Sequence, residues 1–359
     1  MEVWFSGRDQ IDVAIQAPGG VVSDYAQPGQ EKIVKTSAGN QVNIYSDLDA
    51  ANTGDVRVTL ILAQGTAPIL QPGVWKIFLR SRAIVDGRYD AWIERTSHIL
   101  GSGEQARFTV GSTEESCTIS IPGTAKRIIT VGSYVTRPKA NEKSSTGQIS
   151  RFSSHGPTRY GLLKPELVAP GEWIISARSK ASGIKEEPDT LHTVMAGTSM
   201  AAPHVTGAAA LVLGIRPDLR CEEVKQILAR GARRDDFASS APDDLWGDGK
   251  LNIAASLKLA SEVKFPRILK VEISGTTIRW YTEEPTTGAV RFHGHKRQLE
   301  LGKNSGSEVD LMSSTEHTLD LAPRLKPGIL YFCEVLAFDK NSWWTVDDAE
   351  GSFYPISLP

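Results

Sequence analysis

The sequence predicts a multidomain protein in which a β-sandwich or jelly roll is followed by part of an α/β layer and then by a second β-sandwich. Three observations predict this order. Short segments of alternating apolar and polar residues fill positions 1 to about 120, longer apolar runs and helical periodicity follow from about 126 to 260, and alternation returns after 266. The chain of 359 residues is long enough for two or three domains, each able to bury a core.

The first region is predicted to consist of short strands joined by tight turns. Pro-Gly and Asn-Thr-Gly sequences separate segments in which apolar and polar residues alternate. Short strands at this regular spacing are typical of sandwiches and jelly rolls. The alternating segments are 3–5, 11–15, 42–45, 56–62 and 74–79.

Arginine and tryptophan residues of this region are candidates for a face that binds carbohydrate or protein. They are Arg8, Trp75, Arg88 and Trp92. Such residues on strands serve packing and solvated edges more often than ligand binding, and we expect the structural role here.

The middle region changes to an α/β pattern. Residues 128–135 and 173–177 are apolar runs suited to buried strands, and residues 199–213 are suited to a buried helix. Residues 222–232 show amphipathic periodicity with acidic residues in the first turn. Alternating strands and helices indicate a doubly wound parallel sheet, of which this region supplies one part.

The motif that carries most information is Gly197-Thr198-Ser199-Met200-Ala201-Ala202-Pro203-His204. A serine hydroxyl is a weak nucleophile at neutral pH, so it needs a nearby base and N–H groups directed at the oxyanion that forms. The start of a helix supplies such N–H groups and a favourable dipole. Gly197 permits a sharp turn before the helix, and Pro203 is expected within its first turn. Ser199 is therefore predicted to be held on a rigid element.

This motif resembles the nucleophile motif of the subtilisin-like serine proteases, Gly-Thr-Ser-Met-Ala-x-Pro-His-Val-x-Gly, from Gly197 to Gly207. Three more segments are similar to motifs of that family. Residues 152–157 resemble its Phe-Ser-x-x-Gly-Pro loop, and residues 164–171 resemble its Lys-Pro-Asp-x-x-Ala-Pro-Gly segment. Residues 246–252 resemble the Gly-x-Gly-x-x-Asn/Asp segment near the end of the family's domain. These neighbours disfavour the alternative of an ordinary alanine-rich helix with a serine near its start.

The resemblance implies that Ser199 is the catalytic nucleophile and that its N–H belongs to the oxyanion hole. The motif around the nucleophile would then be structural, and it comprises Gly197, Thr198, Met200, Pro203 and His204.

The resemblance also implies a division of the chain into domains. Residues 87–93, 117–125 and 128–133 are similar to a subgroup of subtilases, including germination proteases of spore-forming bacteria, that insert a jelly roll before the nucleophile. We therefore expect three domains. They are a jelly-roll-like insertion at 1–120, the carboxyl-terminal half of a subtilisin-like peptidase domain at 121–262, and a separate domain at 266–359.

The other catalytic groups of the family are not found before the nucleophile, where subtilisin-type enzymes place them. Asp86 lacks the small hydroxyl residue that should follow it, and His98 lacks the glycine that opens a helix. His155 and His192 lie where the family places no base, and the resemblance gives His204 a structural role. The oxyanion Asn has no counterpart either. We expect the reading frame to begin inside a longer coding sequence.

The last region is predicted to be a β-sandwich resembling a fibronectin type III domain. Leu325-Lys326-Pro327-Gly328 before Tyr331 resembles a tyrosine corner, in which the hydroxyl bonds to the backbone upstream. Trp280 is the expected core tryptophan. Trp343 and Trp344 are expected to cap the sandwich core, with an exposed contact surface as the alternative. The predicted strands are 268–273, 277–281, 289–292, 317–321 and 331–338.

Composition excludes several classes of protein. A net charge of -2, a pI near 6.4 and the absence of a long basic run give no electrostatic case for nucleic acid. The most apolar run, residues 208–215, is short for a membrane span, and residues 1–8 do not resemble a signal peptide. The sequence therefore does not identify the cellular compartment of the protein. The widely spaced Cys117, Cys221 and Cys333 indicate buried small side chains rather than a disulfide framework or metal cluster.

Two function classes follow. The chain is either the serine-bearing part of a subtilisin-like endopeptidase, with Asp, His and Asn supplied by a missing amino-terminal segment or by a second chain such as a complementing subtilase fragment, or a catalytically silent scaffold that binds protein or glycan. Protein or peptide is the expected substrate in the first class. No cofactor is expected, and the sequence does not decide whether calcium is bound.

Overall fold

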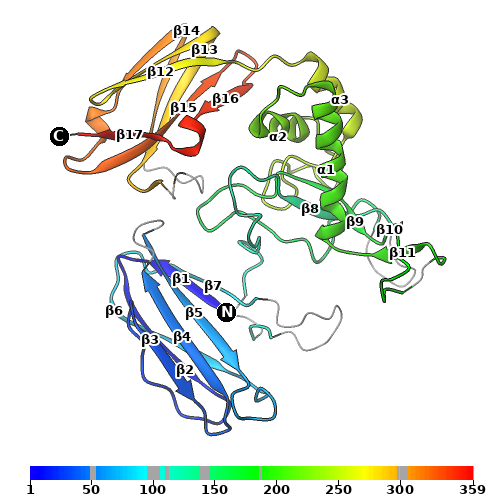
Figure 1. The fold of residues 1–359 in the computed structure, drawn as a ribbon, viewed down its shortest axis with the longest axis vertical. Coiled ribbons are helices and arrows are strands. Elements are labelled where there is room, and N and C mark those ends of the chain that lie inside the picture. Colours follow the sequence, from blue (N-terminus) through cyan, green and yellow to red (C-terminus); the bar gives the residue numbers. More distant parts are fainter. Residues whose placement is uncertain are drawn as a thin grey trace. The chain divides into compact units, whose positions relative to one another are not determined.

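The computed structural model shows a strand-rich, mixed α/β chain that divides into two compact units, Met1–Thr113 and Glu114–Pro359 (Figure 1). Each unit is considered by itself. The described residues are 1–48, 54–94, 106–109, 113–137, 145–185, 188–296, 299 and 306–358.

The first unit contains two antiparallel sheets. One has five strands in the order β3-β4-β5-β1-β7, and the other pairs β2 with β6. Apolar residues facing inward from both sheets form one core that includes Val3, Phe5, Val13, Ile44 and Val58. The strands are β1 (Glu2–Ser6), β2 (Gln10–Gln16), β3 (Glu31–Lys35), β4 (Gln41–Leu48), β5 (Asp55–Ala63), β6 (Lys76–Ala83) and β7 (Tyr89–Trp92).

The candidate ligand-face residues of this unit serve largely structural contacts. Trp75 packs against the core and donates its indole N–H to the Gln71 carbonyl at 3.0 Å. Arg8 pairs with Asp86 at 3.8 Å, and Arg88 pairs with Asp90 at 3.4 Å. The contacts of Arg8 and Arg88 agree with solvated edges, whereas Trp75 packs on the core and also lines a groove beside β3.

The α/β part of the second unit is built on two short sheets. β8 (Val131–Val135) and β9 (Leu167–Glu172) are parallel, whereas β10 (Ile174–Ala177) and β11 (His192–Met195) are antiparallel. The helices are α1 (Thr198–Ile215), α2 (Cys221–Arg230) and α3 (Ile253–Glu262). The parallel sheet is therefore represented among the described residues by one pair of strands.

The expectation of a buried helix at 199–213 is wrong for most of the surface of α1. Only a single stripe faces the core, formed by Ala201, Val205, Ala208 and Val212 at helical spacing. Leu211 is 52% exposed on the opposite side, Leu213 38% and Ile215 45%. The helix is apolar all round, but the described residues cover one face of it.

The length and composition of α1 also differ from the expectation. Its 18 residues have a mean hydropathy of 1.3, which is enough by length and composition for a membrane span, although core helices of soluble proteins pass the same test. The apolar run counted in the sequence, residues 208–215, was shorter because Thr206 and His204 precede it within the same helix.

The carboxyl-terminal part of the second unit is a six-stranded β structure. One pair of predicted strands, 277–281 and 289–292, lies within the single strand β13, which continues through irregular pairing with β14 between Tyr281 and Gly288. Trp280 is fully buried, and the Lys326 N–H donates to the Tyr331 hydroxyl at 3.3 Å, as expected for a tyrosine corner. The strands are β12 (Ile268–Ser274), β13 (Thr277–His293), β14 (Gly306–Asp320), β15 (Leu330–Phe338), β16 (Trp344–Asp347) and β17 (Tyr354–Ser357), and short 3₁₀ turns lie at Ala322–Arg324 and Ala349–Gly351.

Trp343 does not cap the sandwich core, so that expectation is wrong. Its ring packs against the core of the α/β part, edge-on to Phe265 with centroids 5.2 Å apart, and the Arg230 guanidinium lies 4.0 Å above it. The neighbouring Trp344 backbone exchanges hydrogen bonds with the Gln226 side chain at 2.8 and 3.2 Å. The two parts of the second unit are thus packed together at β16 and α2 (Figure 1).

A buried ion cluster joins the same two parts. Glu334 of β15 is 1% exposed and accepts hydrogen bonds from Lys126 Nζ at 2.7 and 2.8 Å, with Arg291 Nη2 2.9 Å from the same carboxylate. Burial lowers the pKa of Lys126, against the opposing effect of the Glu334 carboxylate. Two cations from different parts of the unit therefore share one buried anion.

The three cysteines are free thiols, and they differ in burial. Cys333 is buried, which raises its pKa to about 12. Cys221 is exposed, so the expectation of a buried small side chain is wrong at this position. Its thiol donates to the Arg127 carbonyl at 2.9 Å.

Candidate functional site

Ser199 is positioned by the contact between β9 and the residue that precedes α1. The Gly197 N–H donates to the Gly171 carbonyl of β9 at 2.8 Å, which fixes the chain just before the helix. A Cβ on Gly171 would lie 2.8 Å from the Gly197 carbonyl oxygen and 2.3 Å from Ser133 Oγ, so β9 approaches this closely because it has a glycine there. Gly197 has φ 155° and permits the turn into the helix.

The Ser199 side chain is exposed and lies at the second residue of α1. A backbone N–H at this position has no carbonyl partner within the helix and lies at the positive end of the helix dipole. No described residue forms a hydrogen bond with Ser199 Oγ or the Ser199 N–H. The Ser199 hydroxyl and backbone N–H are therefore both without a partner among the described residues.

Pro203 lies in the second turn of α1, not in the first as expected. A residue at this position would normally donate its N–H to the carbonyl four residues earlier, which belongs to Ser199. Proline has no N–H, so the Ser199 carbonyl loses that partner. The proline thus loosens the helix ladder directly at the candidate nucleophile.

The His204 side chain contacts the backbone of its own helix, α1. Its Nδ1 lies 2.9 Å from the Met200 carbonyl oxygen, one turn earlier, and the ring is half-buried. This contact agrees with the structural role expected for His204, and among the described residues the imidazole forms no hydrogen bond with Ser199 Oγ.

The other histidines considered as bases are not brought to the serine. His192 pairs with Asp189, with Nδ1 2.8 and 2.9 Å from the two carboxylate oxygens. It begins β11, however, and a strand rises about 3.3 Å per residue, so the whole strand and the Gly197 turn separate it from the nucleophile. The His155 backbone pairs with Thr118 through bonds of 2.8 and 2.9 Å. His98 lies outside the described residues.

Asp86 belongs to a turn organised by another aspartate. The Asp9 carboxylate accepts the backbone N–H groups of residues 85, 86 and 87 at 2.6 to 2.9 Å. Burial raises the pKa of Asp9, but these three donors outweigh it and hold the pKa below its usual value. The turn is therefore a structural feature of the first unit.

The segment 164–171 contributes a buried ion cluster behind the nucleophile helix. Lys164 is fully buried; its Nζ donates to the Ile128 carbonyl at 2.6 Å and lies 2.6 Å from Glu166 Oε1. Lys225 of α2 reaches the same oxygen at 2.7 Å, and the Thr130 N–H donates to Glu166 Oε2 at 2.6 Å. Burial, aided by the Lys225 charge, lowers the pKa of Lys164 despite the Glu166 carboxylate.

The segment 246–252 contains a second buried lysine, whose role the sequence did not predict. Lys250 is fully buried, and its Nζ donates to Asp235 at 2.8 and 3.0 Å. Three aromatic rings enclose the ammonium at 5.1 to 5.2 Å, those of Tyr134, Phe237 and Trp246. Asn252 ends the segment and caps α3 by accepting the Ala255 N–H at 3.2 Å.

The site therefore combines one exposed serine with a rigid support. Within the described part of the chain, no three His, Cys, Asp or Glu side chains are placed to share a metal ion. The arrangement offers a hydroxyl nucleophile and an oxyanion donor, and the described residues place no general base beside them.

Comparison with known proteins relates this site to a family. Residues 81–251 match the family model described as Subtilase family. The serine protease AprX of Bacillus subtilis (strain 168) is 38% identical over 148 residues, which are 40% of this chain and 32% of AprX. The subtilisin-like protease SBT4.15 of Arabidopsis thaliana is 37% identical over 110 residues, 29% of this chain and 14% of that protein.

A solved structure is similar over more of the chain. The CspB protease of Clostridium perfringens matches with a TM-score of 0.55 and 25% identity, covering 73% of this chain and 52% of that one. The chain spans between about a seventh and about a half of these relatives. The motifs at Gly197–His204, 164–171 and 246–252 all fall within or at the border of the matched residues. This chain therefore contains a segment, residues 81–251, that is similar to the subtilase family of subtilisin-like serine proteases.

Proposed function

We propose that this chain is the nucleophile-bearing part of a subtilisin-like serine endopeptidase that hydrolyses peptide bonds in proteins or peptides. The observation that carries the proposal is the exposed Ser199 hydroxyl at the amino end of α1, within the residues that match the family. Ser199 Oγ attacks the scissile carbonyl, and the Ser199 N–H stabilises the oxyanion. Gly197, Thr198, Met200, Pro203 and His204 form the support of the nucleophile.

The histidine, aspartate and oxyanion asparagine of the reaction come, in this proposal, from an amino-terminal subtilase fragment. Such a fragment takes the Ser199 proton on the histidine, returns it to the leaving amine, and completes the oxyanion hole. The exposed apolar face of α1 supports this, because a helix that is apolar all round is normally covered on all sides. A complementing fragment that covers Leu211, Leu213 and Ile215 would bring its catalytic groups to the same helix.

The two β regions have structural roles in the proposal. The first unit, extended to about residue 120, is a jelly-roll-like insertion, and residues 266–359 form a fibronectin type III-like domain after the peptidase part at 121–262. The antiparallel sheets of the first unit and the Tyr331 hydroxyl contact support these assignments.

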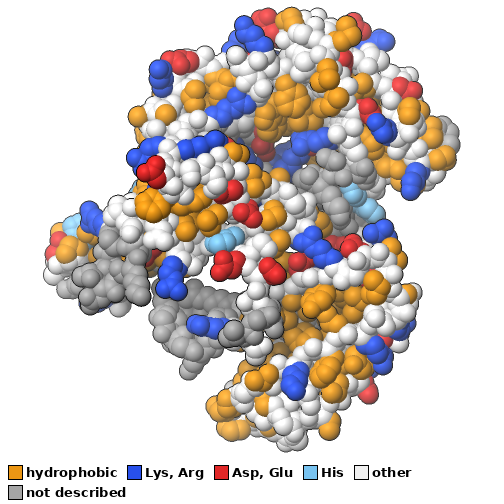
Figure 2. All heavy atoms as spheres, turned by 180° about the vertical axis from the view of Figure 1, so that it is seen from behind, with side chains coloured by type: hydrophobic (Ala, Val, Ile, Leu, Met, Phe, Trp, Pro, Cys, Tyr) orange, Lys and Arg blue, Asp and Glu red, His pale blue; other side chains and the backbone are white. Residues whose placement is uncertain are grey.

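A catalytically silent scaffold is the second candidate. It is favoured by the absence of a histidine or aspartate in contact with Ser199 among the described residues. In this case the β regions bind protein or glycan and Ser199 has no chemical role. On the face shown in Figure 2, basic and acidic side chains are interspersed.

Peptide hydrolysis distinguishes the two candidates. The full chain is assayed on a fluorogenic protein substrate alone and after mixing with the amino-terminal part of a subtilase that carries its aspartate, histidine and asparagine. We expect at most trace hydrolysis from the chain alone, since loss of triad members leaves about 10³- to 10⁴-fold catalysis over water.

The mixture should gain activity that Ser199→Ala abolishes and Ser261→Ala, a change at an exposed serine of α3, preserves. A bound fragment that produces no Ser199-dependent hydrolysis would support the scaffold instead.

A further inference from the structure

Strand β3 leaves one edge of the five-stranded sheet unpaired. It is the terminal strand of the order β3-β4-β5-β1-β7. The Thr36 N–H donates to the Asn40 carbonyl at 2.9 Å, and the Ser46 N–H donates to the Gln30 carbonyl at 3.0 Å, so the even-numbered residues bond to β4. Hydrogen bonds alternate along an antiparallel strand, and Glu31, Ile33 and Lys35 therefore direct their N–H and carbonyl groups away from the sheet.

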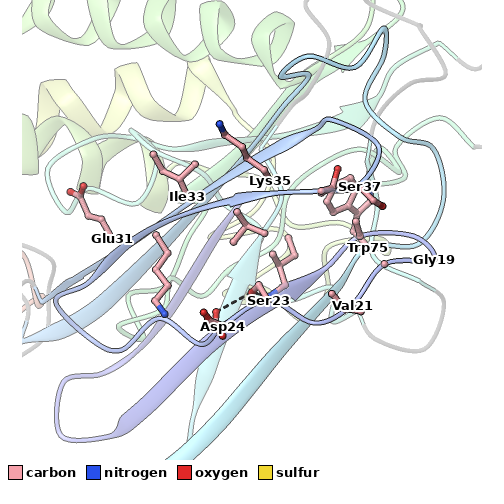
Figure 3. Close-up of a pocket in the computed structure, with 15 residues that line it drawn as sticks. Gly19, Val21, Ser23, Asp24, Glu31, Ile33, Lys35, Ser37 and Trp75 are labelled. Carbon is pink, nitrogen blue, oxygen red and sulfur yellow. Dashed lines mark hydrogen bonds between the residues drawn. The ribbon is translucent and has the colours of Figure 1, made fainter.

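The space beside this edge is open within the unit. A groove of about 700 Å³ runs along β3 and is bounded on its other side by residues 19–24 (Figure 3). Ile33 is 67% exposed and Val21, on the opposite side of the groove, is 89% exposed. Exposed apolar side chains on an unpaired edge are what a further strand would cover.

The charges of β3 are complementary to those of β3 in a second copy of the chain. The side chains of Glu31, Ile33 and Lys35 succeed one another along the strand (Figure 3). Antiparallel pairing about Ile33 places Glu31 of each copy opposite Lys35 of the other, and Ile33 opposite Ile33. Neither charged side chain has an ion-pair partner among the described residues. In-register parallel pairing would instead place Lys35 opposite Lys35, which is unfavourable.

We propose that two copies of this chain associate through antiparallel pairing of β3 with β3, which joins two five-stranded sheets into one. All three outward-facing residues then form hydrogen-bonded pairs across a twofold axis, so the interface is isologous and closes. Lysine protects an edge strand when no acid faces it, but here the incoming strand supplies Glu31 to Lys35. This association is independent of the chemistry at Ser199.

A charge exchange tests the proposal. Sedimentation equilibrium of the full chain over a wide concentration range measures self-association of the wild type, Glu31→Lys, Lys35→Glu and the double variant. Each single change makes both cross-strand pairs repulsive, and we expect it to weaken association about tenfold. The double variant restores both pairs with reversed sign and should associate nearly as well as the wild type. Lys76→Glu, at an exposed position of β6, is the matched control and should have no effect.

Hydrogen exchange supplies a readout specific for β3. The amides of residues 31, 33 and 35 should exchange more slowly as the wild-type concentration rises, and not in the single variants. A wild type that stays monomeric, an association equal in all variants, or a double variant that is not restored would overturn the proposal. Binding of an extended peptide or a glycan to a monomeric chain at this groove would overturn it as well.

Discussion

The Ser199 hydroxyl and the residues that support it show what single positions contribute. Gly197 and Gly171 allow the close approach that fixes the start of α1, and Pro203 removes the helical partner of the Ser199 carbonyl. The sequence motif predicted the helix start and the placement of the serine on it. It did not predict the position of Pro203, because a motif specifies the order of residues and not where the first turn begins.

Lys250 is a fully buried charge, and the stability of the folded protein depends on its pairing with Asp235. Replacing Asp235 by asparagine leaves a fully buried ammonium without its anion, and we expect unfolding in denaturant to require about 3–5 kcal/mol less free energy. Asp236→Asn, at the exposed neighbouring position, should change it by less than about 0.5 kcal/mol. Equal effects of the two changes would contradict the importance of the pair.

The Asp235–Lys250 pair also predicts that the free energy of unfolding depends on pH. Burial raises the pKa of Asp235, but the hydrogen bond and charge of Lys250 outweigh it, so the pKa lies below the usual 3.8. The unfolded chain then takes up the proton on Asp235 at a higher pH than the folded chain. The contribution of the Asp235–Lys250 pair to the free energy of unfolding is therefore complete above the usual pKa of 3.8 and is lost as the pH falls below it. The stability difference between wild type and Asp235→Asn should therefore shrink as the pH falls below about 4. A difference that stays constant down to pH 3 would be inconsistent with this.

At the scale of elements, α1 and β9 show where sequence patterns succeed and fail. The 199–213 pattern predicted a helix, yet hydropathy could not reveal that one face would be uncovered, because covering depends on what packs there. Strand β9 contains Pro170 and Gly171, which disfavour a strand, so no strand was predicted there, and it forms through parallel pairing with β8. Strand β3 is short and bears charges on both sides of Ile33, so it was missed.

Substitutions on the exposed and buried faces of α1 are expected to change the free energy of unfolding by different amounts. Leu211→Gln, on the exposed face, should change the free energy of unfolding of the isolated chain by no more than about 0.5 kcal/mol. Val212→Ala, at a fully buried position, should cost about 1–3 kcal/mol.

Binding of the complementing fragment, measured by calorimetry, should weaken in Leu211→Gln and remain in Val212→Ala under conditions where that variant is folded. A fragment that binds Leu211→Gln as well as the wild type would place the contact elsewhere.

On the scale of the whole molecule, the second unit behaves in this account as one folded body. Trp343 packs on the α/β core, and Glu334 binds cations from both parts. The sequence predicted a separate domain at 266–359, because no local pattern reports contacts between residues 126 and 334. Tyr331 and Trp280 were predictable, since their roles are internal to the sandwich.

Glu334→Gln tests this coupling. It removes the anion shared by Lys126 and Arg291, and we expect a loss of about 3 kcal/mol together with separation of the single unfolding transition into two. Glu316→Gln removes an exposed ion pair with Arg279, whose side chains are 54% and 48% exposed, and should cost about 0–1 kcal/mol. Scanning calorimetry of both variants measures each quantity. A Glu334→Gln protein that melts like the wild type would show that the two parts fold independently.

Covalent labelling of the serine tests the central claim most directly. The full chain is treated with a fluorophosphonate, alone and with the complementing amino-terminal fragment, and the modified residue is identified by mass spectrometry. The account predicts an adduct on Ser199 that forms with the fragment, is nearly absent without it, and disappears in Ser199→Ala. An adduct at another serine, or none at Ser199 while the fragment is bound, would contradict it.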